Sequence, residues 1–234
     1  MLLVLDIGNT NTSIGVFGDC ASGSSEFPAA RARFSSADRT SDEAGLLLEN
    51  LFRSRGIDKK SLAGAILCCV VPRLETVWRE GIREYFGVDP VAVSDRIDLG
   101  LEIDMDVPGE VGADRLANAA AGAEKYGRPV IIVDLGTAIN IDVVSSDGRY
   151  IGGAIAPGLA TSVQTLFSST AKLPQVALEA PPKAVGRNTV QAIQSGIVYG
   201  YTGLVDELVN RVWGELGAKT PVVATGGHAE ILAV

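Results

Sequence analysis

One short pattern occurs twice in this sequence, and it constrains the possible folds more than any other feature. Asp6-Ile-Gly-Asn-Thr10 follows an apolar run at residues 2–5, and Asp134-Leu-Gly-Thr-Ala138 follows a second apolar run at residues 130–133. A glycine allows the backbone to come close to an anion, and free N–H groups with Thr or Asn side chains can donate to phosphate oxygens. The carboxylate beside them can hold a metal ion that neutralises the phosphates. The repeat therefore predicts a nucleotide held between two similar domains.

The charge and hydropathy of the chain exclude several partners and locations. Its 234 residues carry a formal net charge of −8 with a pI of about 4.7, whereas nucleic acids and anionic membranes select a basic surface. No apolar run approaches the ~20 residues of a membrane span. The first apolar residues follow no basic segment and are interrupted at once by Asp6, which argues against a secretory signal. We therefore expect a cytoplasmic protein that binds neither nucleic acid nor membrane.

The three cysteines predict neither a disulfide nor a zinc site. Cys68 and Cys69 are neighbours, and Cys20 lies far from both in the sequence. This spacing fits neither a usual disulfide nor a zinc site. We interpret Cys68 and Cys69 as two buried thiols on a strand in a reducing cytoplasm.

Periodicity in the first half predicts the order strand, strand, strand, helix, strand, helix, strand. The helix expected at residues 40–55 places Ala44, Leu48 and Leu51 on one face. A continuous apolar run at residues 63–71, ending at Pro72, predicts a buried strand. The other strands are expected at residues 2–5, 12–17, 30–34 and 91–93, and the second helix at residues 74–86. This is the element order of an actin-like, ribonuclease H-like domain.

The second half repeats the three-strand plan behind a helix expected at residues 113–126. Strands are expected at residues 130–133, 139–144 and 150–155, with an Asp147-Gly148 turn joining the last two. Helices should follow from residue 159 to 166 and from 189 to 214, and then a strand at residues 221–224. We therefore predict an α/β fold of duplicated ribonuclease H-like (actin-like ATPase) domains, residues 1–112 and 113–234, with the nucleotide in the cleft between them.

Several segments carry candidate chemistry, and each has a plainer structural interpretation. The first aspartate loop could be only a tight hairpin turn, although its near-copy at Asp134 weighs against that. Thr225-Gly226-Gly227 could approach an adenine or a ribose, or be an ordinary turn after a strand. Gly112-Ala-Asp-Arg115 opens a helix, so Asp114 could be a dipole partner or cap, or a base that takes a proton from a substrate hydroxyl. Arg115 could hold a substrate carboxylate with paired N–H donors.

Three further segments have interpretations that need no ligand. Gly152-Gly-Ala-Ile-Ala-Pro-Gly158 is typical of a strand end followed by a helix start. Gly186-Arg-Asn-Thr189 is a plausible helix cap, with Asn188 or Thr189 as the capping residue. His228, the single histidine, is most simply an incidental residue after the last glycines.

Taken together, these segments resemble the type III pantothenate kinases, the bacterial enzymes that begin coenzyme A synthesis. The two boxes Gly112-Ala-Asp-Arg115 and Gly186-Arg-Asn-Thr189 are far more specific than the phosphate loops, which are shared across the acetate and sugar kinase, Hsp70 and actin superfamily. The other matching segments are Leu5-Asp-Ile-Gly-Asn-Thr-Asn-Thr12, Val70-Val-Pro72, Val133-Asp-Leu-Gly-Thr-Ala138, Gly152-Gly-Ala-Ile-Ala-Pro-Gly158, Gln194-Ser-Gly196 and Ala224-Thr-Gly-Gly227.

The resemblance implies an enzyme that uses ATP with Mg²⁺ to phosphorylate pantothenate to 4'-phosphopantothenate. It implies Asp114 as general base and Asp134 as ligand of a monovalent cation, potassium or ammonium. It also implies a homodimer with sites at the interface, where Thr137 contacts ATP and Thr189 contacts pantothenate from the other subunit. The remaining implied contacts are with the ATP phosphates at Asp6, Ile7, Gly8, Asn9, Thr10, Asn11, Thr12 and Ser13, and with pantothenate at Met105, Gly112, Ala113, Asp114 and Arg115.

The sequence departs from the family pattern in three places. Met105 replaces a tyrosine that the family often has, which removes a hydroxyl donor towards pantothenate. Ile139 and Asn140 stand where the second loop commonly continues with two threonines, which we expect to remove two hydroxyls near the phosphates. The family usually continues past the last glycine pair, whereas this sequence ends at Val234, so we expect a closing helix on the second domain to be absent.

These departures leave two alternatives to a pantothenate kinase. One is a non-catalytic regulator of the same fold that binds pantothenate or nucleotide. The retention of four residues counts against it: Asp6, Asp114, Arg115 and Asp134. The other is a kinase for another small hydroxyl substrate, such as a sugar. The two specific boxes favour pantothenate over a sugar.

Overall fold

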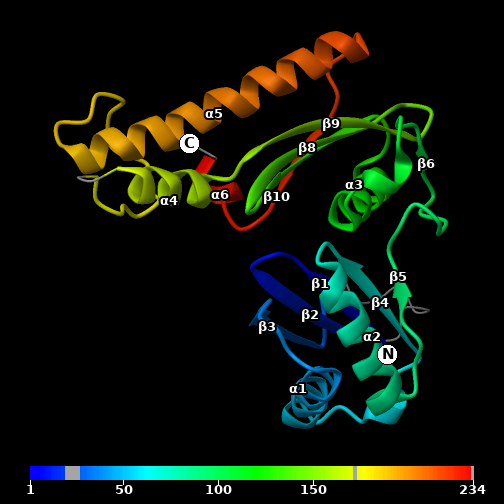
Figure 1. Ribbon diagram of the computed structural model, residues 1–234. Coiled ribbons are helices and arrows are strands. Elements are labelled where there is room, and N and C mark those ends of the chain that lie inside the picture. Colours follow the sequence, from blue (N-terminus) through cyan, green and yellow to red (C-terminus); the bar gives the residue numbers. More distant parts are fainter. Residues whose placement is uncertain (19–26, 171–172, 233–234) are drawn as a thin grey trace. The chain divides into compact units, whose positions relative to one another are not determined.

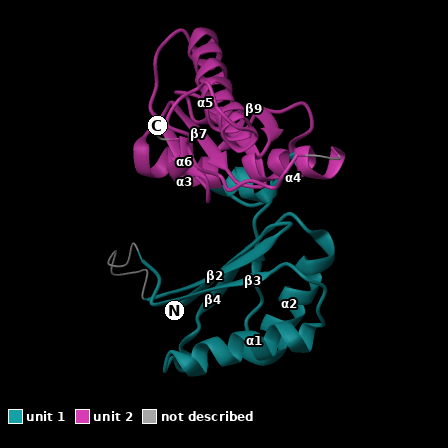
Figure 2. Cartoon of the chain, turned by 90° about the vertical axis from the view of Figure 1, so that its left-hand side faces the viewer, with its two compact units in different colours: residues 1–98, 109–117 teal, residues 99–108, 118–234 magenta. Residues whose placement is uncertain are grey.

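The computed structural model describes residues 1–18, 27–170 and 173–232, so Cys20 lies outside the described residues. The chain divides into two compact units, teal and magenta in Figure 2, each of which is described by itself. Unit 1 comprises Met1–Asp98 and Gly109–Ala117, and unit 2 comprises Leu99–Pro108 and Asn118–Val234. The predicted boundary after residue 112 falls within the second segment of unit 1, and the two domain ranges stay a prediction.

Unit 1 is a five-stranded sheet with two helices, in the element order that the sequence predicts (Figure 1). The strands lie in the order β3-β2-β1-β4-β5; β1–β2 and β2–β3 are antiparallel, whereas β1–β4 and β4–β5 are parallel. The elements are β1 (Leu2–Ile7), β2 (Asn11–Phe17), β3 (Ala30–Ser35), α1 (Ser41–Ser54), the 3₁₀ turn Lys59–Ser61, β4 (Gly64–Cys69), α2 (Pro72–Phe86) and β5 (Val91–Ala92).

The two helices of unit 1 begin where local chemistry dictates. Thr40 caps α1: its side chain accepts from the Glu43 N–H at 3.2 Å, and the Glu43 carboxylate accepts from the Thr40 N–H at 2.7 Å. Helix α2 begins at Pro72, whose fixed φ and missing N–H suit the first helical position. It ends at Gly87, which takes a left-handed conformation with φ of 69°.

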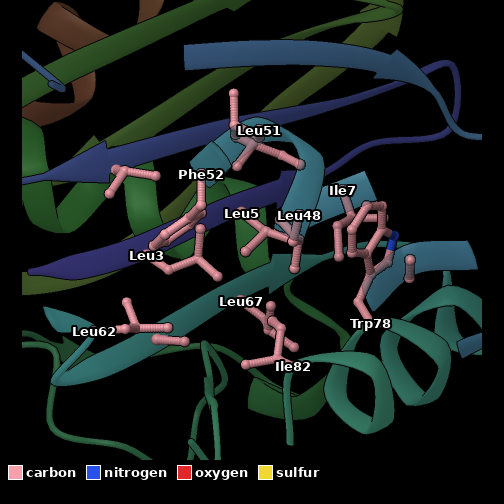
Figure 3. Close-up of a cluster of buried hydrophobic side chains, with 14 of the residues drawn as sticks. Leu3, Leu5, Ile7, Leu48, Leu51, Phe52, Leu62, Leu67, Trp78 and Ile82 are labelled. Atoms are coloured by element: carbon pink, nitrogen blue, oxygen red, sulfur yellow. The ribbon is translucent and has the colours of Figure 1, made fainter. Parts of the chain in front are cut away.

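One face of this sheet forms the core of unit 1 against α1 and α2. Strand β1 alternates, so Leu3, Leu5 and Ile7 are fully buried on that face. Figure 3 shows them packed with side chains from the helices, among them Phe52 and Trp78. Asp6, between two buried neighbours, is exposed on the opposite face.

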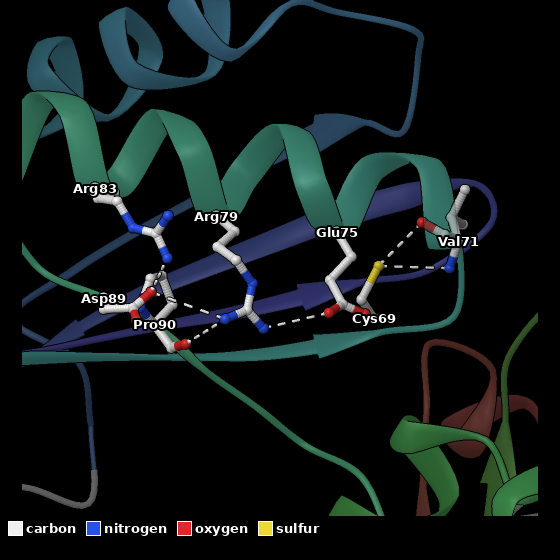
Figure 4. A network of polar contacts seen from close by, with 7 residues as sticks. All are labelled: Cys69, Val71, Glu75, Arg79, Arg83, Asp89 and Pro90. Carbon is white, nitrogen blue, oxygen red and sulfur yellow. Dashed lines mark hydrogen bonds and ion pairs between the residues drawn. The ribbon is translucent and has the colours of Figure 1, made fainter.

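Beyond Cys69, a polar network joins α2 to the segment that leads into β5 (Figure 4). Arg79 donates to the Pro90 carbonyl at 3.2 Å, and Arg83 donates to Asp89 at 2.7 Å, which lowers the pKa of the Asp89 carboxyl. The Cys69 thiol donates to the Val71 carbonyl at 3.2 Å. Cys68 and Cys69 are both free thiols, but they are half-buried and not fully buried as expected. Cys69 packs against the edge of the core, whereas Cys68 lies on the opposite face of the sheet, in the row of Asp6.

Unit 2 repeats four of the five strands of this sheet plan, and its fifth strand lies at the other edge (Figure 1). The strand order is β10-β7-β8-β9-β6, so the antiparallel run β9-β8-β7 with parallel β10 corresponds to β3-β2-β1-β4 of unit 1. This confirms the predicted duplicated α/β fold. The elements are β6 (Glu102–Ile103), the 3₁₀ turn Pro108–Glu110, α3 (Ala113–Tyr126), β7 (Val130–Leu135), β8 (Ala138–Val144), β9 (Arg149–Pro157), α4 (Leu159–Ser169), α5 (Thr189–Leu216), β10 (Val222–Thr225) and α6 (Ala229–Leu232).

The two faces of the unit 2 sheet are both covered. Ile131, Val133 and Leu135 pack with α4 and α5, and Gly122 of α3 lies against Ile132 on the other face. Because both faces are covered, residues 130–133 form a continuous apolar run. Within the described ranges, no helix is long and apolar enough to cross a membrane.

Candidate functional site

In unit 1 the candidate site begins where β1 ends. Gly8 donates its N–H to the Asn11 carbonyl at 3.0 Å, which closes the turn, and Ser36 donates to the Thr10 carbonyl at 2.9 Å, which ties the turn to the end of β3. Asn9 and Thr10 are exposed. Ile7 and Thr12 are fully buried, and the Thr12 hydroxyl lies 3.0 Å from that of Ser36. These two predicted ATP contacts can therefore offer a ligand only backbone groups.

Three polar side chains come together beside this turn. Asp6 is paired in register with Ser13 on β2 and with Cys68 on β4, so the three share one row of the sheet. Burial raises the pKa of the Cys68 thiol, and the negative charges of Asp6 and then Asp114 raise it further. Asp6 is the register partner of Cys68, and a Cβ atom at Gly112 would lie 3.8 Å from Val70, so the segment that carries Asp114 lies at the end of β4. The structure therefore brings the predicted base and the first phosphate loop into one cluster within unit 1.

The Gly112–Arg115 box holds Asp114 at the start of α3. The Asp114 Oδ1 atom accepts a hydrogen bond from the backbone N–H of Arg115 at 2.8 Å, as a first-turn carboxylate commonly does. A Cβ atom at Gly112 would lie 2.5 Å from that same oxygen, so only glycine leaves the carboxylate in place. The capping and the catalytic interpretations of Asp114 are thus compatible, because one oxygen meets the backbone while the group lies near Asp6 and Cys68.

In unit 2 the second aspartate loop forms a comparable cluster. Asp134 is paired in register with Thr225 on β10 and Asn140 on β8, and its Oδ2 atom accepts from the Asn118 amide at 3.0 Å. Sequence reasoning missed Asn118, although its i, i+4 spacing from Asp114 places the two on one face of α3. Gly226 has a φ of 94°, and a Cβ atom there would lie 2.6 Å from the Asp134 Oδ1 atom.

The backbone of the second loop is held by the start of α4. The Thr137 carbonyl accepts from the Gly158 N–H at 3.1 Å and from the Thr161 hydroxyl at 2.8 Å. Gly158 precedes the first residue of α4, which confirms the strand-to-helix interpretation of that glycine segment. The structure corrects one expectation here: Ile139 packs in the α4–α5 core with 1% exposure, so of the two departures only Asn140 lies beside Asp134.

The other predicted contacts lie elsewhere in unit 2. Met105 is half-buried, and its sulfur would lie 3.1 Å from a Cβ atom placed at Gly152. Thr189 is exposed at the first position of α5, and Asn188 is the capping residue, accepting from the Gln191 N–H at 2.9 Å. His228 is half-buried, and its backbone N–H donates to the Leu135 carbonyl at 3.1 Å.

Within residues 1–18, 27–170 and 173–232, no three His, Cys, Asp or Glu side chains gather in a way that could hold a metal ion. Asp134 would therefore share a cation with amide, hydroxyl or carbonyl oxygens, which suit hard cations without a cage of carboxylates.

Comparisons with known proteins agree on one family. The family model described as type III pantothenate kinase matches residues 2–211. A type III pantothenate kinase from Roseiflexus sp. (strain RS-1) is 48% identical over all of this chain and 89% of its own length. One from Dehalococcoides mccartyi (strain ATCC BAA-2100 / JCM 16839 / KCTC 5957 / BAV1) is 47% identical over 99% of this chain and 86% of its own length.

Solved structures share the fold at low identity. Component A of (R)-2-hydroxyglutaryl-CoA dehydratase from Acidaminococcus fermentans matches with a TM-score of 0.54 at 15% identity, over 98% of this chain and 84% of that one. A conserved Campylobacter jejuni protein, described as a Baf family transcriptional activator, matches with a TM-score of 0.55 at 20% identity, over 99% of this chain and 86% of that one.

Proposed function

Since the chain belongs to the type III pantothenate kinase family, its activity is the ATP-dependent phosphorylation of pantothenate in coenzyme A biosynthesis, and we propose which of its residues carry that reaction. The observation that supports the assignment most directly is the cluster of Asp6, Cys68 and Asp114 in unit 1. It brings a phosphate-loop carboxylate close to a carboxylate that can accept a proton.

Asp114 is the general base of the proposal. Phosphoryl transfer depends mainly on positioning and on neutralising charge, so the chain needs one group to take the proton of the attacking hydroxyl. Asp114 can do so with the oxygen that does not accept from Arg115. Arg115 follows it directly and orients the pantothenate carboxylate with paired N–H donors.

The exposed turn at Gly8–Thr10 binds the phosphates of ATP. Its donors are backbone N–H groups together with the side chains of Asn9, Thr10 and Ser13. Asp6 lies in the same row as Ser13. A carboxylate beside neutral oxygen ligands is a ligand set that suits Mg²⁺. Bound with ATP, Mg²⁺ would neutralise charge on the phosphates.

Asp134 holds the monovalent cation in unit 2, and Thr137 contacts ATP. Asn118 donates to Asp134, and Asn140 and Thr225 are its register partners, so these three residues can supply amide and hydroxyl oxygens beside the carboxylate. Such a set suits a singly charged hard cation such as potassium or ammonium.

A homodimer completes the proposal, with Thr189 and Met105 as pantothenate contacts. Four large apolar side chains are exposed along α4 and around the start of α5: Leu166, Phe167, Val185 and Val190. Helices α4 and α5 pack against each other, so the exposed side chains of Leu166, Phe167 and Val190 belong to two adjoining helices of unit 2 (Figure 1). Exposed apolar side chains gathered in one region are typical of a surface that another chain covers. Their exposure in a single chain supports an interface between two copies.

The activity is tested by coupled ADP release with pantothenate, with and without K⁺, against a panel of sugars. We expect turnover with pantothenate alone and a rise with K⁺. Asp114→Asn should abolish most of the turnover with pantothenate. The charge-matched control Glu124→Gln, exposed on the same helix, should keep that turnover. Turnover with a sugar and not with pantothenate would point to a kinase for another small hydroxyl substrate. ATP binding without turnover on any substrate would point to a regulator.

A further inference from the structure

Two arginines of β3 lie on the same sheet face as Asp6. In β3, Ala30, Ala32 and Phe34 pack on the unit 1 core, so the alternate residues Arg31 and Arg33 project from the opposite, exposed face. Asp6 of β1 is exposed on that face too, because its neighbours Leu5 and Ile7 are buried. The face opposite α1 and α2 therefore carries positive charge as well as a phosphate-loop carboxylate.

The strand register places Arg33 beside the phosphate loop and Arg31 further from it. Arg33 is paired with Ser13, which is itself paired with Asp6, so the three form one row. Of the two diagonal neighbours of Arg33 on β2, Asn11 is the one nearer the loop, at about 7–8 Å in an antiparallel pair, which an extended arginine side chain spans. Arg31 is paired with Gly15, two residues or about 7 Å further along the strand.

The phosphate loop itself supplies no positively charged side chain. Residues 6–13 contain one aspartate and no lysine or arginine, whereas a nucleoside triphosphate brings several negative charges. Other arginines near β3 are engaged: Arg39 donates to the Ser35 carbonyl at 2.6 Å, and Arg73 pairs with Asp38. Among the residues that the structure describes, Arg33 makes no ion pair.

We propose that Arg33 binds the polyphosphate of ATP from β3, across Ser13. The inference rests on the proposed function of the Asp6 loop and adds a residue to it. The guanidinium presents several N–H donors in one plane, which matches the oxygens of a phosphate better than an ammonium group does. Arg33 would thus offset the charge that Asp6 and the phosphates bring together.

The test is the affinity for ATP, measured by titration calorimetry on the wild-type chain and three variants. Arg33→Gln should weaken ATP binding about tenfold, the usual order for loss of a charge-assisted hydrogen bond. Arg33→Lys should weaken it less, because the charge stays and the paired donors go. Arg31→Gln is the matched control, with the same charge removed from the same face, and it should stay within about twofold. Adenosine, which has no phosphate, should bind all four proteins equally.

The outcomes separate the inference from the proposed function. If the wild-type chain does not bind ATP, the proposed function fails. If the wild-type chain binds ATP and Arg33→Gln binds it equally well, the role of Arg33 is overturned. The role is also overturned if Arg31→Gln loses as much affinity for ATP as Arg33→Gln does. Should Arg33→Gln not fold, Arg33→Lys decides. A lower affinity for ATP with an unchanged affinity for adenosine supports the contact, and an unchanged affinity for both ligands overturns it.

Discussion

The two glycines that end the last strand should respond very differently to the same substitution. Gly226 has a φ of 94°, and an added Cβ atom would lie 2.6 Å from the Asp134 Oδ1 atom and 2.6 Å from the Leu135 backbone. Gly227 has no positive φ, and an added Cβ atom there would meet nothing within 4 Å. Gly227→Ala is therefore a control that adds the same methyl group one residue away.

The cost at Gly226 has two sources. A left-handed backbone costs an ordinary residue roughly 1–2 kcal/mol. Forcing a methyl group into a packed site typically costs a further ~1–3 kcal/mol. We expect Gly226→Ala to lower the free energy of unfolding by about 2–5 kcal/mol, a large part of the ~5–15 kcal/mol of a typical domain. Part of the clash can be relieved if Asp134 swings away, but that movement breaks its 3.0 Å hydrogen bond with Asn118.

The assay is urea unfolding followed by circular dichroism and by tryptophan fluorescence, measured in a Trp78→Phe background so that Trp213 reports on unit 2. Turnover and its dependence on K⁺ are measured on the same samples at a temperature where all proteins are folded. Gly226→Ala should be less stable and should lose the K⁺ response, and Gly227→Ala should match wild type in stability. A Gly226→Ala protein as stable as wild type, or a Gly227→Ala protein destabilised equally, would refute the reasoning.

Three further substitutions test other parts of the molecule. Asp114→Asn should lower kcat by about 10²-fold or more with little change in melting temperature, as expected for a lost general base, and steady-state kinetics with thermal unfolding check both. Gly112→Ala should also lower kcat while the chain stays folded, because the methyl group displaces only the Asp114 carboxylate. Trp78→Ala should lower the free energy of unfolding by about 3–5 kcal/mol, since Trp78 is fully buried, and urea titration measures it.

A last prediction in this group concerns Cys68. Burial raises its pKa, and Asp6 and Asp114 raise it further, so little thiolate is present near pH 8 and alkylation by iodoacetamide should be slow. Asp114→Asn removes one of those charges and should speed the reaction, which mass spectrometry of the modified peptide follows. Equal rates in the two proteins would contradict the proximity of Asp114 to the thiol.

Signals within a few residues predicted most of the secondary structure. The Thr40–Glu43 pair and Pro72 mark helix starts because capping and proline geometry act within one turn. The alternation of Leu3, Leu5 and Ile7 follows from the two-residue period of a strand. Strand β6 was missed, since it has two residues and is defined by its pairing with Arg149–Tyr150 far along the chain.

The face on which each residue lies required the tertiary structure. Cys68 and Cys69 are identical neighbours in the sequence, yet Cys68 shares a row with Asp6 while Cys69 packs against the core. Ile139 and Asn140 likewise lie on opposite faces, so only Asn140 is beside Asp134. A two-residue period sends neighbours to opposite faces, but only the packing of helices decides which face is the core.

The repeated aspartate motif and the Gly112–Arg115 box are local, so sequence alone was enough to predict a nucleotide fold and a family resemblance. Asn118, Thr161 and Arg33 entered the candidate site only through their partners in space, the Asp134 carboxylate, the Thr137 carbonyl and Ser13. Register and long-range hydrogen bonds join residues far apart in the chain, and no pattern of nearby residues encodes such pairs. Local chemistry therefore specified the loops of this protein, and tertiary packing decided which side chains surround them.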